Sequence, residues 1–204
     1  MYIWFRYIFV FLTSISLLSH RGETVLQIDD YPVFHFWGNT ADVIVEDGNG
    51  EIAIDSMLGT SFLFPISAGK IFSLCFGSCR IHMKIPKDIP VHVRMLSGNI
   101  EVCDRKEVDI TVDSGLVSTR NVSSSRISLL HGFVDGIVPA EGTYLLTGHN
   151  IQAQIYSNKE WSYEILHKGK SFLSTSDSSV DAFAKVEFFE GKIELLSDGI
   201  ANRF

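Results

Sequence analysis

Residues 91–117 read VHVRMLSGNIEVCDRKEVDITVDSGLV, and the chain repeats this pattern with a period of seventeen residues through residues 91–151. Each repeat carries a glycine, with apolar residues at alternate positions before it and one more after it. The columns are Gly98, Gly115 and Gly132; Val93, Ile110, Ile127 and Tyr144; Met95, Val112, Leu129 and Leu146; and Ile100, Val117 and Val134. A fixed short period indicates a supersecondary unit that stacks on copies of itself.

The alternation inside each repeat is that of a β-strand. Val108, Ile110 and Val112 alternate with Asp109 and Thr111, so one side of the strand is apolar and the other is polar. A repeat of this length is too short for a strand–helix–strand crossover. We therefore predict an all-β, single-domain β-solenoid in which each turn has two short strands and a glycine corner, with few or no helices after residue 22.

The composition fits a folded, acidic domain. The chain has 204 residues, 46% of them hydrophobic, and a formal net charge of −7. This length can bury a substantial core. Nucleic acid normally requires a basic surface, so it is not an expected partner, and no cluster of Lys and Arg indicates a lipid-headgroup site.

Residues 1–22 are set apart by their hydrophobicity. Residues 1–18 are almost wholly apolar or aromatic, and Arg6 is their only charge. A positive residue, about a dozen apolar residues and then small polar ones are typical of a secretory signal peptide, here with cleavage after Ser19. An uncleaved signal anchor and a buried N-terminal segment of a cytosolic fold are the alternatives. We expect export to the periplasm, to the membrane or to the medium.

The rest of the chain reads as short strands separated by turns. Residues 23–84 are predicted to form irregular coils that cap one end, with a hairpin or an irregular first coil over residues 41–55 around Asp47-Gly48-Asn49-Gly50. Residues 85–90 contain two prolines and are predicted as a loop. Residues 85–204 hold the repeat and a C-terminal cap.

Beyond residue 151 the period loosens. Trp161 and Tyr163 lie seventeen residues after Tyr144 and Leu146, which predicts one more turn there. Residues 180–189 alternate, and residues 189–195 repeat the pattern around a glycine, as the last coil or its cap.

The start of the repeat carries a family resemblance. Residues 85–102 read IPKDIPVHVRMLSGNIEV, a proline-led strand followed by Ser-Gly-Asn-Ile; Ser114-Gly115-Leu116-Val117 is a second copy and Gly191-Lys192-Ile193 a weaker one. Over residues 85–151 this resembles the bacterial putative-adhesin domains of unknown function. The resemblance implies a right-handed β-solenoid, often exported or membrane-tethered, and it implies no catalytic site. Leu116 and His131 depart from the family pattern, which usually has Asp or Asn and Ser there.

Three cysteines, Cys75, Cys79 and Cys103, are candidates for chemistry. In an exported chain Cys75 and Cys79 could close a short disulfide loop and leave Cys103 unpaired. The alternative is that the cysteines are small buried hydrophobic residues. A lone C-x3-C spacing is not a zinc framework.

Histidines invite a metal interpretation. His82 and His92 lie in alternating strands, and His131 and His149 flank corner glycines, where stacked coils would bring them about 5 Å apart. Two imidazoles do not complete a metal site, so we expect surface histidines.

Carboxylates recur along the repeat. A β-helical glycosidase clusters such acids in a cleft, but here their sequence positions scatter over corners and outward sites. The five acids are Glu101, Asp104, Asp109, Asp113 and Asp135.

Asn121-Val122-Ser123 satisfies the N-glycosylation rule, a match that would be incidental in a bacterial protein.

These features predict an exported, non-enzymatic, adhesin-like binding or scaffold module of the cell envelope. No catalytic, cofactor-binding or metal residue is assigned, and no cofactor is expected. The expected partner is a protein or glycan at the cell surface, with membrane contact only through the N-terminal segment and self-association through open strand edges as a further option. The alternatives are a self-assembling structural polymer subunit and a carbohydrate-active β-helix enzyme.

Overall fold

The structure, a computed structural model, describes residues 23–27, 33–66, 70–138, 141–157, 162–174, 182–197 and 200–203. Side chains are described for residues 33–53, 80–138, 141–157, 162–170 and 183–196. The predicted signal peptide or anchor, residues 1–22, lies outside the described residues.

Strands make up almost all of the described chain. They are β1 Glu23–Gln27, β2 Val33–Asp47, β3 Glu51–Ile66, β4 Lys70–Ile85, β5 Val91–Val138, β6 Gly142–Ser157, β7 Ser162–His167, β8 Lys170–Ser174, β9 Ala182–Ser197 and β10 Ile200–Arg203. The described segments contain no helix, and so none long and apolar enough to cross a membrane. The prediction of an all-β fold is confirmed.

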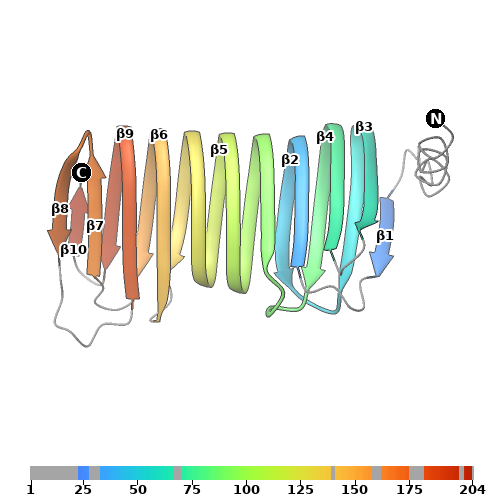
Figure 1. The fold of residues 1–204 in the computed structure, drawn as a ribbon, viewed down its shortest axis with the longest axis horizontal. Helices are drawn as coiled ribbons and strands as arrows, with labels where there is room; N and C mark the ends of the chain where they lie inside the picture. The colour runs from blue at the N-terminus through green and yellow to red at the C-terminus, as the bar shows by residue number, and fades with distance from the viewer. Residues whose placement is uncertain are drawn as a thin grey trace, which may run out of the picture.

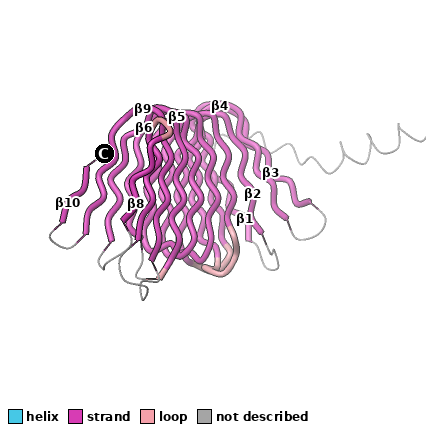
Figure 2. Tube along the Cα trace, turned by 60° about the vertical axis from the view of Figure 1, so that its left-hand side comes forward, coloured by secondary structure: helices cyan, strands magenta, loops and turns pink. Residues whose placement is uncertain are grey.

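All ten strands belong to one mixed sheet with the order β1-β3-β4-β2-β5-β6-β9-β7-β8, and β10 pairs with β9. The middle is parallel, while β1–β3, β3–β4, β7–β8 and β9–β10 pair antiparallel. Figure 1 shows β5 winding through successive passes that lie side by side along the long axis, and Figure 2 shows neighbouring passes following one outline. β5 is one strand of 48 residues, not two short strands per turn, because it remains strand through its corners.

At the glycine column, neighbouring passes leave no room for a side chain. A Cβ added to Gly98 would lie 1.9 Å from the carbonyl oxygen of Ala41, one on Gly115 would lie 1.9 Å from that of Gly98, and one on Gly132 would lie 2.0 Å from that of Gly115. Gly98 also has a φ of 135°, which other residues rarely adopt. At this corner, glycines seventeen residues apart therefore lie on adjacent passes.

Columns of apolar side chains fill the interior that the passes enclose. Their members are at most 4% exposed, so the alternation read from the sequence separates core from surface. Examples are Phe34, Val91 and Val108; Phe36, Val93 and Ile110; and Val43, Ile100 and Val117.

The predicted hairpin over residues 41–55 is wrong. β2 and β3 lie on either side of β4, which pairs in parallel with β2 and antiparallel with β3. The turn at residues 48–50 is held by the end of β4: Gly50 N donates to the Lys84 carbonyl at 2.8 Å and Gly48 N to the Ile85 carbonyl at 3.2 Å. The turn therefore carries the chain across β4 instead of folding it back onto β2.

The predicted place of Tyr144 is also wrong. It lies opposite Ser125 rather than Ile127, so β5 and β6 are nineteen positions apart and not seventeen. The buried Tyr144 ring requires space that small neighbours leave, since a Cβ on Gly136 would lie 2.4 Å from its hydroxyl oxygen. This hydroxyl lies 3.2 Å from Thr119 Oγ1, and burial raises the pKa of Tyr144 far above its ordinary value.

The further turn predicted seventeen residues after Tyr144 does not lie next to it. β9 pairs with both β6 and β7, so Ala184 stands between Tyr144 and Tyr163; Trp161 lies outside the described residues. β9 has alternating buried residues and a corner glycine, Gly191, whose added Cβ would lie 1.7 Å from the Ile151 carbonyl oxygen. β9, and not β7, therefore lies beside β6 and carries the next corner glycine.

Candidate functional site

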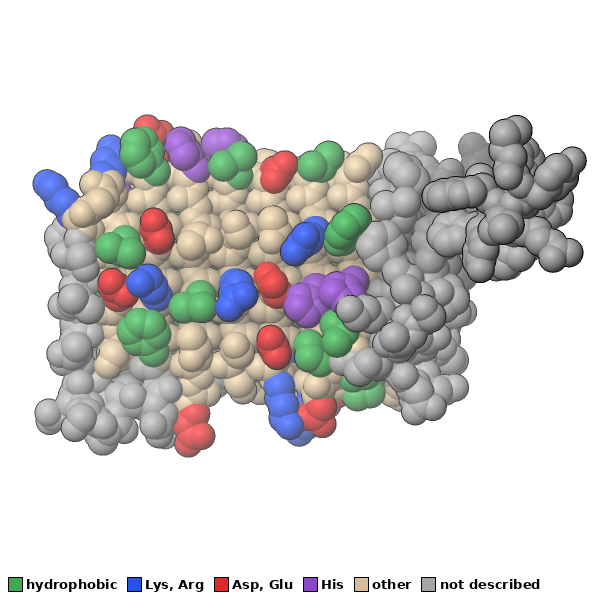
Figure 3. All heavy atoms as spheres, in the orientation of Figure 1, with side chains coloured by type: hydrophobic (Ala, Val, Ile, Leu, Met, Phe, Trp, Pro, Cys, Tyr) green, Lys and Arg blue, Asp and Glu red, His purple; other side chains and the backbone are tan. Residues whose placement is uncertain are grey.

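One continuous surface of the sheet, here called the long face, consists of the outward side chains of residues 35–39, 92–96, 109–113, 126–130, 145–149 and 185–189. The pairing of β2, β5, β6 and β9 aligns these side chains into three rows. The first row is His35, His92, Asp109, Arg126, Leu145 and Lys185; the second is Trp37, Arg94, Thr111, Ser128, Thr147 and Glu187; the third is Asn39, Leu96, Asp113, Leu130, His149 and Phe189. Figure 3 shows charged, histidine and hydrophobic side chains in lines along the long axis.

The first row is polar apart from Leu145, and contacts between neighbouring passes hold its side chains. The rings of His35 and His92 stack with centroids 4.7 Å apart, and His92 Nδ1 lies 3.6 Å from Asp109 Oδ2. At the other end, Lys185 Nζ lies 2.8 Å from Glu164 Oε2 on β7. These contacts fix the positions of charges on an otherwise flat surface.

The third row exposes hydrophobic side chains. Leu96 is 55% exposed, Leu130 47% and Phe189 51%. The His149 ring stacks on Phe189 at 5.2 Å between centroids, and Lys168 Nζ lies 5.7 Å from the centre of the Phe189 ring. Apolar and aromatic groups spaced among polar ones are typical of surfaces that bind other molecules.

Two shallow hollows interrupt the long face. One, of about 340 Å³, lies where β2 meets the first pass of β5, beside Trp37 and Arg94. The other, of about 250 Å³, lies between β5, β6 and β9, beside Arg126, Thr147 and Lys185. Both combine polar side chains with apolar surface, so each can hold a ligand that has polar and apolar parts.

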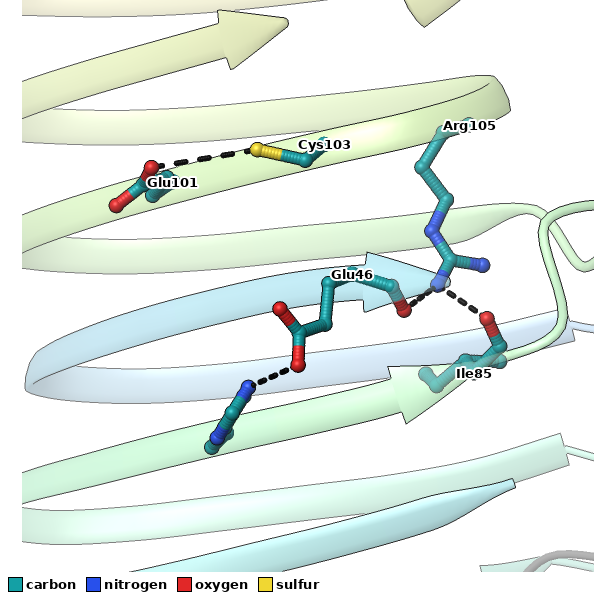
Figure 4. Close-up of polar contacts among 6 residues, drawn as sticks. Glu46, Ile85, Glu101, Cys103 and Arg105 are labelled. Atoms are coloured by element: carbon teal, nitrogen blue, oxygen red, sulfur yellow. Dashed lines mark hydrogen bonds and ion pairs between the residues drawn. The ribbon is translucent and has the colours of Figure 1, made fainter. Parts of the chain in front are cut away.

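Arg105 is a buried charge that the sequence pattern did not predict, because the equivalent residue one repeat later is Val122. Its guanidinium donates to the Pro86 carbonyl at 2.7 Å and to the carbonyls of Glu46 and Ile85 (Figure 4). Burial lowers the pKa of Arg105. The contacts satisfy carbonyl groups at the ends of β2 and β4, so its role is structural.

The cysteines are only partly placed. Cys103 is a half-buried free thiol with Sγ 4.0 Å from Glu101 Oε1, and burial, followed by the Glu101 charge, raises its pKa (Figure 4). The backbones of Cys75 and Cys79 on β4 pair with Gly38 and Ala41, while their side chains lie outside the described part. The proposed Cys75–Cys79 disulfide therefore stays a prediction.

The histidines of the described segments lie on the surface in separate groups. His131 and His149 are neighbours, as predicted, with ring centroids 6.0 Å apart and edge-on. His82 Nε2 lies 2.8 Å from Glu46 Oε1, and His92 contacts Asp109. Among the described side chains no group of three or more His, Cys, Asp or Glu could hold a metal ion.

The five candidate carboxylates have different surroundings. Glu101 lies beside Cys103, Asp104 accepts from Asn121 Nδ2 at 2.6 Å, and Asp109 faces His92. Asp113 borders the hollow near Trp37, and Asp135 is exposed. The fold thus distributes these acids over several parts of the surface. Asn121, which matches the N-glycosylation rule, is exposed at a corner with its amide nitrogen in the bond to Asp104.

Sequence reasoning did not find the hollow at Trp37. Trp37 and Arg94 are paired across β2 and β5, fifty-seven positions apart, and the seventeen-residue period gives no information about that pairing. The usable signal was local: a tryptophan at a polar-side position of a predicted strand.

Comparison with known proteins finds similarity at the level of structure only. No protein-family model matches the chain, and no curated protein matches its sequence. Among solved structures, the chain is similar to a putative cell adhesion protein from Clostridium sporogenes ATCC 15579, with a TM-score of 0.46 and 9% identity, over 86% of this chain and 99% of that one. At this level of similarity, function must be argued from the surface itself.

Proposed function

We propose that the protein is an exported, non-enzymatic binding module of the cell envelope, adhesin-like in its use of one continuous β surface. The observation that carries this proposal is the long face, where exposed apolar and aromatic groups alternate with fixed charges across four strands. Such a surface suits contact with an extended partner, because it is flat and its groups repeat along one axis.

The underlying architecture that we propose is a right-handed β-solenoid with coils of about seventeen residues. The stacking of Gly98, Gly115 and Gly132 supports the coil length. The handedness rests on the strong general preference for right-handed connections between parallel strands of one sheet. A high-resolution experimental structure would test both.

A binding role is favoured over catalysis by the arrangement of the acids. Glycoside hydrolysis requires two carboxyl groups about 5–10 Å apart across a cleft. Here Asp109 contacts a histidine, Asp104 contacts an asparagine, and Glu101 lies beside a thiol. These surroundings fit surface and corner roles.

A discrete module is favoured over an end-to-end polymer by the two ends of the sheet. The order ends in β1 and β8, each of five residues and each paired antiparallel with its inner neighbour. Short edge strands limit pairing with another chain. Light scattering should give one monomer mass from low to high concentration, and a mass that grows with concentration would favour the polymer.

Export is tested by expressing the full-length protein, fractionating the cells and measuring intact masses. A product shortened by roughly 19 to 22 residues in the envelope or medium would support a cleaved signal peptide. A full-length mass in the membrane would support an anchor. A full-length, soluble cytoplasmic product would overturn export.

Binding is tested with the product recovered from that experiment, labelled and added to isolated bacterial cell envelopes. We expect saturable binding that weakens when Leu130→Asp places a charge in the third row, where Leu130 is 47% exposed. Glu107→Lys changes charge at an exposed site outside the three rows and serves as the control. The absence of saturable binding, or equal loss in both variants, would contradict a binding role for the long face.

A further inference from the structure

The hollow near Trp37 lies on the long face at the junction of β2 and the first two passes of β5. Its volume is about 340 Å³, and it is bordered by side chains from three neighbouring passes. They are Trp37, Asn39, Arg94, Leu96, Thr111 and Asp113. Since these residues are far apart in sequence, only the folded sheet creates this group.

The sheet register fixes the positions of these groups. Trp37 is paired with Arg94 and Gly38 with Met95, which places the indole beside the guanidinium and leaves Met95 as buried surface below. The Cβ position of Gly38 points inward, 2.6 Å from the buried Phe36 ring, so Gly38 belongs to the packed layer beneath the hollow. The hollow therefore lies over the core of the β2–β5 junction.

The apolar part of the hollow is exposed to solvent. Trp37 is 44% exposed and Leu96 is 55% exposed. An exposed indole offers a large, rigid apolar surface at little cost in conformational entropy. It suits a ligand with a flat apolar side.

The polar part offers both donors and acceptors. Arg94 supplies only donors, Asp113 only acceptors, and Asn39 and Thr111 supply both. Arg94 and Asp113 have opposite charges, so the group has no net charge and does not select an anion or a cation. A phosphate or a carboxylate would meet Asp113 as well as Arg94.

We propose that this hollow binds one ring of a neutral saccharide. A pyranose ring has an apolar C–H side that can stack on the indole of Trp37, and a rim of hydroxyl groups that both donate and accept. The mixed donors and acceptors of Arg94, Asn39 and Asp113 match that rim. The assignment rests on the proposed binding function, and it names a glycan as the partner.

The test uses the product that cells make when they express the full-length sequence. Saturation-transfer NMR measures its binding to a panel of neutral trisaccharides of glucose, galactose, mannose and N-acetylglucosamine. We expect saturation transfer to at least one of them and an affinity about tenfold lower for Trp37→Ala, with partial recovery for Trp37→Tyr. Ile137→Ala trims another exposed apolar side chain, one that lies outside the long face, and should leave binding unchanged.

Three results in this NMR assay would overturn the assignment. They are transfer to none of the neutral trisaccharides, equal binding by Trp37→Ala and the unchanged protein, and equal losses for Trp37→Ala and Ile137→Ala. Thermal unfolding of each variant checks that the sheet is intact. If Trp37→Ala still binds isolated envelopes fully, the saccharide site is wrong and the binding module stands; if the unchanged protein binds no envelopes, the module itself is wrong.

Discussion

Gly98→Ala tests the close packing of neighbouring passes at the glycine corner. The added Cβ would lie 1.9 Å from the Ala41 carbonyl oxygen, about 1.4 Å short of the roughly 3.3 Å at which a carbon and a carbonyl oxygen normally meet. β2 and β5 would have to separate there, and the hydrogen bonds between them would lengthen.

Two terms set the expected loss. Holding alanine at the Gly98 φ of 135° costs about 1–3 kcal/mol. Relieving the contact by a shift of the backbone costs about another 1–3 kcal/mol. We therefore expect the free energy of unfolding to fall by about 2–6 kcal/mol.

Gly169→Ala is the matched control. Gly169 also has a positive φ, 75°, but an added Cβ there would meet no atom within 4 Å. It should cost only about 1–2 kcal/mol, the conformational term alone. Urea unfolding followed by circular dichroism measures both variants under identical conditions. Equal losses at the two glycines would refute the argument that passes touch at Gly98.

Four further results are expected. Ile110→Asp places a charge at a fully buried position and should lower the free energy of unfolding by more than about 3 kcal/mol in the same urea assay. Thr111→Asp, on the outward side of the strand, is its control and should change the free energy of unfolding by less than about 1 kcal/mol. Arg105→Met removes the donor that the Pro86, Glu46 and Ile85 carbonyl groups share and should cost about 2–4 kcal/mol by scanning calorimetry; an unchanged melting temperature would contradict its role. Burial raises the pKa of Tyr144 in the folded protein, so the unfolded chain loses this phenol proton first as pH rises through about 10. The free energy of unfolding therefore falls above that pH. Tyr144→Phe removes this titration and should reduce the difference between the urea midpoints at pH 8 and pH 11. The raised pKa of Cys103 predicts slower alkylation by iodoacetamide at pH 8 in the folded than in the unfolded protein, as peptide mass spectrometry can measure, and equal rates would refute it.

The repeat shows how far sequence reasoning could reach for the fold. Alternation identified the buried side of β5, and the glycine column identified a corner where passes touch. Both are local properties, because each depends on residues within one repeat or exactly one repeat apart. The prediction failed at Tyr144, where the large ring and the small neighbours Thr119 and Gly136 set a different register.

For the candidate site, the sequence identified residue types but not which side chains they contact. It named Asp109 and Asp113 among five scattered repeat acids but not their neighbours: the first faces His92 and the second borders the hollow at Trp37. It expected His131 and His149 to be neighbours, because both lie next to corner glycines, and they are. It gave no sign of Arg105, whose partners come from two other strands and a loop.

The sequence by itself therefore determined the all-β class, the alternation of core and surface, and the glycine corner of the repeat. Only the tertiary structure decided that β4 separates β2 from β3, that β9 lies between β6 and β7, and that Trp37 meets Arg94. The physical reason is that periodicity fixes the spacing of equal repeats, whereas pairing between distant strands depends on side-chain volumes and on the connections between them.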